Sequence, residues 1–178
     1  MNIDRIHVKE AFKAYVSDYD LSDVKVKLKV DHTYRVAAMC DAITEDLRLS
    51  AADRDLAWLS GMLHDIGRFE QLRQYHTFQD RLSCNHAMLS ADILFRDGKI
   101  RLFVNDADEE VTALLEKTIR LHNVYRLPGD LSTREYSFAT ILRDADKIDI
   151  LRVNCETPRS EIYDLPEEAF RTAAITDQ

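Results

Sequence analysis

Apolar residues recur at helical spacing along much of the chain. From residue 24 they stand at positions 24, 28, 36, 39, 43 and 47, and the gap in this stripe, position 32, is a histidine. Residues three or four positions apart share one face of an α-helix, so the pattern predicts a helix over residues 24–47 with a buried face. Ser22 is a suitable N-cap for this helix.

Capping residues and glycines divide the next part of the chain. A second helix is predicted from Ser50, whose S-x-x-D pattern resembles a capping box, to a stop at Gly67. Residues 68–84 are polar and aromatic without a clear period, which is typical of a loop. A third helix, capped by Ser83, is predicted to run to about Asp97.

Two longer helices are predicted in the second half of the chain. Acidic residues in the first turn indicate a helix that begins near Asp108 and stops before Pro128. One face of it carries Val111, Leu115, Thr118, His122 and Tyr125. Ser132 caps the second helix, which Pro158 ends. Its stripe is apolar except for one aspartate and consists of Ala139, Leu142, Asp146, Ile150 and Val153.

Length and turn residues indicate the fold class. A chain of 178 residues has the size of one domain, and its 4 glycines and 3 prolines are too few for the turns of a β-sandwich or barrel. No repeat or shift in composition marks a second unit. We therefore expect an all-α, single-domain bundle of about six or seven helices over residues 1–178. The last helix, over residues 160–178, is short enough to be the start of a truncated element.

The net charge and the cysteines indicate which binding partners and which cellular compartment to expect. A formal net charge of −8 argues against a long nucleic-acid footprint, which needs a basic stripe. A small anionic ligand held by a few Arg or Lys residues stays open. No apolar block resembles a signal peptide or a membrane span. The 3 cysteines are scattered and form neither a disulfide framework nor a zinc ribbon, so we expect a cytoplasmic protein.

Ionisable residues interrupt the apolar stripes where a core helix normally has Leu or Val. They are His32, His64, His86, His122 and Asp146. A single core histidine is usually bonded to a backbone carbonyl, but an unpaired buried polar group costs about 1–3 kcal/mol, and domains are stable by only about 5–15 kcal/mol. A shared metal ion would satisfy all five, because imidazole and carboxylate are ligands for iron, manganese, cobalt, nickel and zinc. Asp65, beside His64, has two oxygens with which to bridge two ions.

Taken in order, five short motifs resemble the HD-domain superfamily, an all-helical fold of metal-dependent phosphohydrolases. The motifs are "DHTYRVA" with His32, "LHDIG" with His64 and Asp65, "CNHAMLSADIL" with His86, "IRLHN" with His122 and "DADKID" with Asp146. The resemblance spans residues 28–153. It implies that His32, His64, Asp65 and Asp146 hold one metal, and that His86 and His122 add ligands for a second. Iron or manganese is expected, with cobalt, nickel, zinc or magnesium as alternatives. Asp146 matches the Ala-Asp position of the superfamily better than Asp144 does.

The same resemblance implies a reaction and its catalytic residues. A metal-bridging hydroxide would attack the phosphorus of a nucleotide or another small phosphate ester, with Asp65, Arg68 and Lys147 as catalytic candidates. Arg68 stands where many members have a phosphate-binding lysine, although it could equally be a dipole partner of its helix. Asp149, one turn beyond Asp146, is suited to hold a metal-binding side chain in place without binding the metal itself. The chain lacks the GYP signature of the cyclic-di-GMP phosphodiesterases, which disfavours that substrate.

Two other functions stay open on sequence grounds. A few HD-fold proteins with this ligand set are mixed-valence di-iron oxygenases, and a degenerate site would leave a non-catalytic ligand-sensing domain. Arg35, one turn after His32, is either a further phosphate contact or an exposed helix charge. His76, for which the alternative is a place at the substrate mouth, and His7 are interpreted as surface groups. The sequence does not determine the physiological substrate, the native metal or self-association.

Overall fold

The computed structural model describes residues 3–105 and 108–158 and the single residues 162, 168 and 172. Within them all regular structure is helical. The α-helices are α1 (Arg5–Val16), α2 (Val24–Asp46), α3 (Ala51–Leu63), α4 (Ile66–Tyr75), α5 (His86–Ala91), α6 (Glu109–Arg120) and α7 (Thr133–Glu156). Short turns η1 (Asp80–Leu82), η2 (Asp92–Arg96) and η3 (Lys99–Leu102) lie between them. The prediction of an all-α bundle is confirmed.

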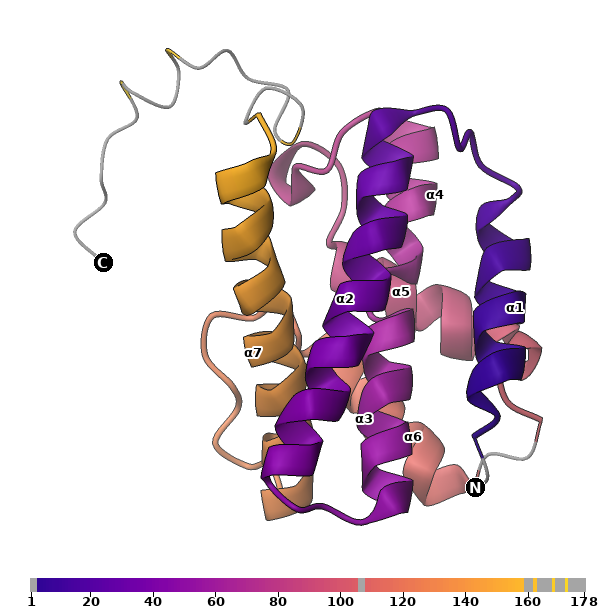
Figure 1. Ribbon diagram of the computed structural model, residues 1–178, viewed down its shortest axis with the longest axis vertical. Helices are drawn as coiled ribbons and strands as arrows, with labels where there is room; N and C mark the ends of the chain where they lie inside the picture. Colours follow the sequence, from indigo (N-terminus) through magenta and orange to yellow (C-terminus); the bar gives the residue numbers. More distant parts are fainter. Residues whose placement is uncertain (1–2, 106–107, 159–161, 163–167, 169–171, 173–178) are drawn as a thin grey trace.

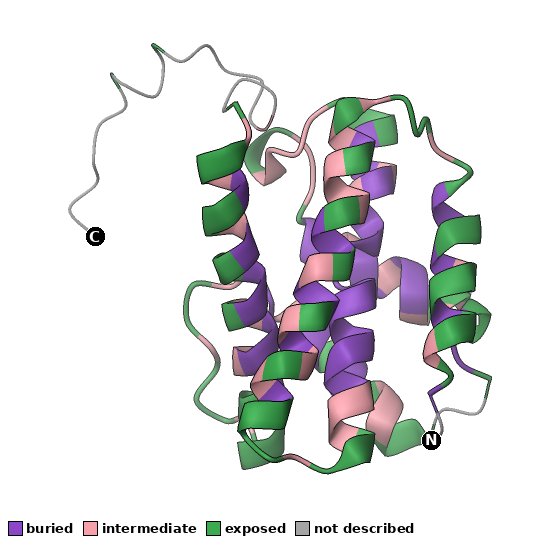
Figure 2. Cartoon of the chain, viewed as in Figure 1, coloured by how far each residue is buried: buried purple, intermediate pink, exposed green. Residues whose placement is uncertain are grey.

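The long helices α2 and α7 run side by side and form one side of the bundle (Figure 1). Helix α3 packs along α2 more extensively than any other element, and α1 contacts α3. The buried residues face the interior between these helices, and the exposed residues of α1 and α7 face outward (Figure 2). The three helices α2, α3 and α7 thus surround a common interior.

Close packing of α2 and α3 depends on Gly61. A Cβ atom at this position would lie 2.6 Å from the Cα of Ala37 in α2, well inside van der Waals contact. The two backbones can therefore approach only because position 61 has no side chain. This contact brings the C-terminal end of α3, and with it His64, against α2.

The expected single helix from Ser50 to Gly67 is wrong. Ser50 caps α3 as predicted, but α3 ends at Leu63 and a new helix, α4, begins at Ile66. Gly67 lies inside α4, where a Cβ would be 2.6 Å from the backbone nitrogen of Ser90 in α5. The glycine permits a close approach of two helices and is not a helix stop. The segment expected to be a loop is accordingly helical as far as Tyr75.

Several other boundaries differ from the prediction. Asp23 rather than Ser22 caps α2, and Asn85 rather than Ser83 caps α5. Helix α5 passes into the π-helical turn η2, which ends at Arg96. In each case a neighbouring residue with an equally suitable side-chain oxygen makes the cap, a choice that a local pattern does not resolve.

The helix expected from Asp108 to Pro128 is shorter than predicted. Helix α6 ends at Arg120, so His122 lies in the following turn and Tyr125 is 83% exposed instead of sharing the buried face. The prediction for α7 is confirmed, including the cap by Ser132 and the end before Pro158; the structure adds that Ser132 and Glu135 form a capping box. Helix α1 was not predicted, and the helix expected over residues 160–178 lies almost entirely outside the described residues.

In the part of the chain that the structure describes, no helix is both long and apolar enough to span a membrane.

Candidate metal centre

The six predicted metal ligands meet in one buried cluster. His32 lies in α2, His64 and Asp65 lie at the junction of α3 and α4, and His86 begins α5, whereas His122 follows α6 and Asp146 belongs to α7. None is more than 7% exposed. The break between α3 and α4 matters here, because it lets two adjacent residues both point into the interior.

The carboxylate of Asp65 lies between two pairs of imidazole rings. Its Oδ2 is 3.6 Å from Nε2 of His32 and 3.5 Å from Nε2 of His64. Its Oδ1 is 3.6 Å from Nε2 of His86 and 3.6 Å from Nε2 of His122. Each oxygen therefore faces its own pair of nitrogen donors, which is the arrangement of a carboxylate that can serve two cations.

Asp146 belongs to the first of these pairs. Its Oδ1 is 3.2 Å from Nε2 of His32 and 3.8 Å from Nε2 of His64. Asp144, the alternative raised by the sequence, is exposed on α7 and belongs to neither set of donor atoms that could hold a metal ion. Two sets of donor atoms lie within 4.8 Å of one another and could hold a metal ion: His32 with His64 and Asp146, and His64 with Asp65 and His122.

Hydrogen bonds to Nδ1 orient the rings of His64 and His122. The Nδ1 atom of His64 is 2.8 Å from the carbonyl oxygen of Gly61, and that of His122 is 2.8 Å from the carbonyl oxygen of Ile119. A carbonyl oxygen only accepts, so Nδ1 carries the hydrogen in both rings. The other ring nitrogen, Nε2, faces the cluster and is the atom that can bind a metal.

The other two rings are held by carboxylates. His32 Nδ1 lies 2.6 Å from Oδ2 of Asp149, and His86 Nδ1 lies 2.6 Å from Oδ2 of Asp80. Arg35 donates to both oxygens of Asp149, so this arginine is not a free surface charge. Burial lowers the pKa of His86 to about 4, which keeps the ring neutral at pH 7. A neutral ring with its Nδ1 hydrogen bonded to a carboxylate is the usual form of a metal-binding histidine.

The atoms that face the interior have unmet bonding capacity. Among the described residues, His32 Nε2, His64 Nε2 and Asp65 Oδ1 are buried without a hydrogen-bond partner. Burial would raise the pKa of Asp65, but the positive charge of Lys29 holds it well below its usual range, so the carboxylate is ionised. Orphaned nitrogens and an ionised, buried carboxylate match the chemistry of a divalent metal site.

A comparison with protein families agrees with this geometry. The family model described as HD domain matches residues 30–151, more than half of the chain. The chain belongs to the HD-domain family. HD domains bind divalent metals and are in general metal-dependent phosphohydrolases, and the all-helical fold and the buried His and Asp groups agree with that membership. Searches of the curated proteins and of the solved structures found no match.

Lys29, which contacts Asp65 of the HD dipeptide, was not predicted as a site residue. Lys29 Nζ lies 2.7 Å from Oδ2 of Asp65, and only 13% of the lysine side chain is exposed. Lys29 precedes His32 by three residues and therefore shares its helix face, a spacing that could have revealed it. Asp80 was also missed, because it lies in a segment between α4 and α5 without any helical period.

Arg68 and Lys147, two of the predicted catalytic residues, differ in their contacts and exposure. Nη1 of Arg68 donates to Gln71, to the carbonyl of Phe78 and to Asp80, while its Nε lies 3.8 Å from Oδ1 of Asp65. Lys147 pairs with Oδ2 of Asp146, and its side chain is 56% exposed. Arg68 is thus fixed next to the cluster of this HD domain, whereas Lys147 covers it from the solvent side.

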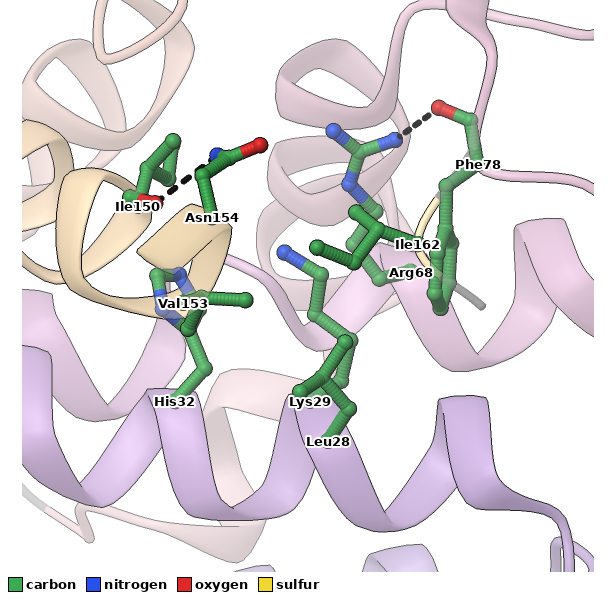
Figure 3. Close-up of a pocket in the computed structure, with 9 residues that line it drawn as sticks. All are labelled: Leu28, Lys29, His32, Arg68, Phe78, Ile150, Val153, Asn154 and Ile162. Carbon is green, nitrogen blue, oxygen red and sulfur yellow. Dashed lines mark hydrogen bonds between the residues drawn. The ribbon is translucent and has the colours of Figure 1, made fainter. Parts of the chain in front are cut away.

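A pocket opens beside the cluster. Lys29, His32 and Arg68 line it together with residues of α7. Figure 3 shows His32 beside Val153 of α7, Arg68 on the side of Phe78, and Lys29 between them. His76 and His7, the two histidines outside the HD motifs, are exposed and lie elsewhere. His7 contacts the carbonyl oxygen of Leu102.

Proposed function

We propose that this HD domain is a metal-dependent phosphohydrolase that acts on a nucleotide or another small phosphate ester. The observation that carries the proposal is the position of Asp65, whose two oxygens face two separate pairs of imidazole nitrogens. The adjoining pocket places Lys29 and Arg68 next to the same carboxylate, where an anion would bind.

Two divalent cations, iron or manganese, are the proposed cofactors. His32, His64 and Asp146 would hold the first together with Oδ2 of Asp65. His86 and His122 would hold the second together with Oδ1 of Asp65. When bound, such cations activate water near neutral pH and offset charge on phosphate oxygens.

The chain's own groups would bind and orient the ester. Lys29 and Arg68 supply positive charge at the pocket end that adjoins the cluster, and Lys147 supplies it on the solvent side. Hydrolysis breaks the bond between phosphorus and the alcohol oxygen and forms one to the oxygen of water. The alcohol leaves with a proton from that water, so no serine or cysteine nucleophile is required.

Release of phosphate in the absence of oxygen tests this function. The chain is purified anaerobically, its metals are measured, and nucleotides and other phosphate esters are screened for phosphate release with Mn²⁺ or Fe²⁺. We expect turnover that is lost, together with metal, in His64→Ala and Asp65→Ala and retained in Asp144→Asn, which alters an exposed residue. Consumption of oxygen without hydrolysis would contradict the proposal in favour of the di-iron oxygenase. A full metal site without turnover would favour a ligand sensor.

A further inference from the structure

We infer that the pocket beside His32 binds the alcohol part of the substrate, and that it selects a compact apolar or aromatic group over a sugar. This inference rests on the proposed function and narrows its substrate class. It concerns the space next to the cluster, which is bounded by α2, by the segment that follows α4, and by α7 (Figure 3).

Apolar side chains make up most of the pocket wall. They are Leu28, Phe78, Ile150, Val153 and Ile162. Figure 3 shows Ile150 and Val153 of α7 on one side of the pocket and Phe78 on the other, with Leu28 of α2 below. Binding of an apolar group here removes both its own surface and that of the wall from water, which favours association in proportion to the area buried.

The two positive charges of the pocket lie near Phe78. Lys29 Nζ and the guanidinium of Arg68 each lie 5.6 Å from the centre of the Phe78 ring. The same two side chains contact or approach Asp65 at 2.7 Å and 3.8 Å. A phosphate bound between these cations would therefore lie next to the cluster, and the group esterified to it would extend along the apolar wall.

The rest of the described lining offers little to a sugar. Apart from Lys29 and Arg68, the polar side chains among the described pocket residues are His32, whose Nδ1 lies 2.6 Å from Asp149, and Asn154, whose amide donates to the carbonyl oxygen of Ile150 at 2.8 Å. A ribose or glycerol group has several hydroxyls, each of which needs a hydrogen-bond partner when it leaves water. The pocket thus favours an alcohol that has carbon where a sugar has hydroxyl groups.

Binding of substrate analogues tests the inference without requiring turnover. Butylphosphonate and 2,3-dihydroxypropylphosphonate carry the same anion on an apolar and a polar chain of similar length. Calorimetric titration of the metal-loaded full chain is expected to show at least tenfold tighter binding of butylphosphonate. Equal affinities, or tighter binding of the dihydroxy compound, would overturn the inference.

Turnover of the matched esters gives a second measurement. We expect a kcat/KM for butyl phosphate at least tenfold above that for glycerol 3-phosphate or AMP, mainly through KM. Glycerol is the better leaving group of the two alcohols, so a preference for the butyl ester would come from binding. If no ester is hydrolysed, the proposed function fails, and the titration still decides whether the pocket prefers an apolar group.

Substitutions in the apolar pocket wall test whether this wall causes the preference for butyl compounds. Ile150→Ser should reduce the advantage of the butyl compounds about fivefold or more and leave metal content unchanged. Leu151→Ser is the matched control, because Leu151 is the next residue of α7 and is 68% exposed. If Ile150→Ser folds poorly, Phe78→Ala tests the same wall at a residue outside α7. An undiminished preference in both wall variants would show that another surface binds the alcohol.

Discussion

The Nε2 atoms of His86 and His122 lie 3.0 Å apart. Both rings use Nδ1 for hydrogen bonds, to Asp80 and to the carbonyl oxygen of Ile119, so an Nε2 atom that carries no hydrogen directs its lone pair at the other ring. Such a contact is repulsive unless a proton or a cation lies between or beside the nitrogens. Oδ1 of Asp65, 3.6 Å from each, adds negative charge at the same point. This half of the cluster therefore favours a positive ion.

Replacement of His86 should remove one of two metal ions. In His86→Ala the proposed second metal position loses a ligand, whereas the first position, held by His32, His64 and Asp146, is intact. We expect metal content to fall from about two to about one per chain, measured by elemental analysis after dialysis. His76→Ala, which alters an exposed histidine, should keep the full content. Loss of all metal in His86→Ala would mean that the two sets do not bind independently.

Two aspartates of α7 should differ in their effect on the metal. Asp146 lies 3.2 Å from Nε2 of His32, and Asp144 is exposed two residues earlier. Asp146→Asn removes a charged ligand and should weaken binding at the first set by at least tenfold. Asp144→Asn should leave the affinity unchanged. Titration of the metal-free chain with Mn²⁺ measures both, and the reverse order of effects would refute the assignment of Asp146.

Asp149 should act on the metal through His32. Its carboxylate accepts from Nδ1 of His32 and is held in turn by Arg35, which fixes the orientation of the His32 ring. Loss of such a partner typically costs about 10–100-fold in metal affinity. Asp149→Asn is expected to show a loss of that size with an unchanged helical content by circular dichroism. The exposed Glu156→Gln, farther along α7, serves as the control.

Lys29 should contribute to binding of the substrate anion. Lys29→Met removes the positive charge at the pocket end and should raise KM for every phosphate ester, about tenfold or more, whatever the alcohol. Lys29→Arg should restore part of the affinity, since it keeps the charge. Lys27→Met alters an exposed lysine of the same helix and should have no effect. An effect confined to kcat would place Lys29 outside substrate binding.

The contact between α2 and α3 should depend on the absence of a side chain at position 61. In Gly61→Ala a Cβ would meet the Cα of Ala37 at 2.6 Å, so the helices must separate. Overpacking of this kind typically costs about 1–3 kcal/mol of unfolding free energy. Chemical denaturation should show this loss. Gly129→Ala, where a Cβ meets nothing within 4 Å, should change stability little, and an equal loss in both would contradict the packing argument.

The sequence by itself determined the all-α class and the set of donors. Five of the six donors interrupt predicted apolar stripes, a local property that periodicity reveals without knowledge of the fold, and Asp65 follows from the HD dipeptide that it forms with His64. His32 fills the gap in the stripe of α2, and Asp146 fills the same kind of gap in α7. Burial of these side chains followed from the stripes, because a residue on the buried face of a helix is carried into the core with its neighbours.

The tertiary structure decided how the donors are paired. The division of Asp65 between two pairs of rings depends on distances among elements far apart in the chain, from His32 in α2 to His122 after α6, about which a local pattern carries no information. The same holds for the partners of the rings: Asp80 reaches His86 through a segment without a helical period. It also holds for Gly67, for which the local pattern predicts a helix end, whereas the structure shows α5 packed against it. Periodicity reports which face of a helix is buried, whereas only the packing of one helix on another fixes which atoms meet there.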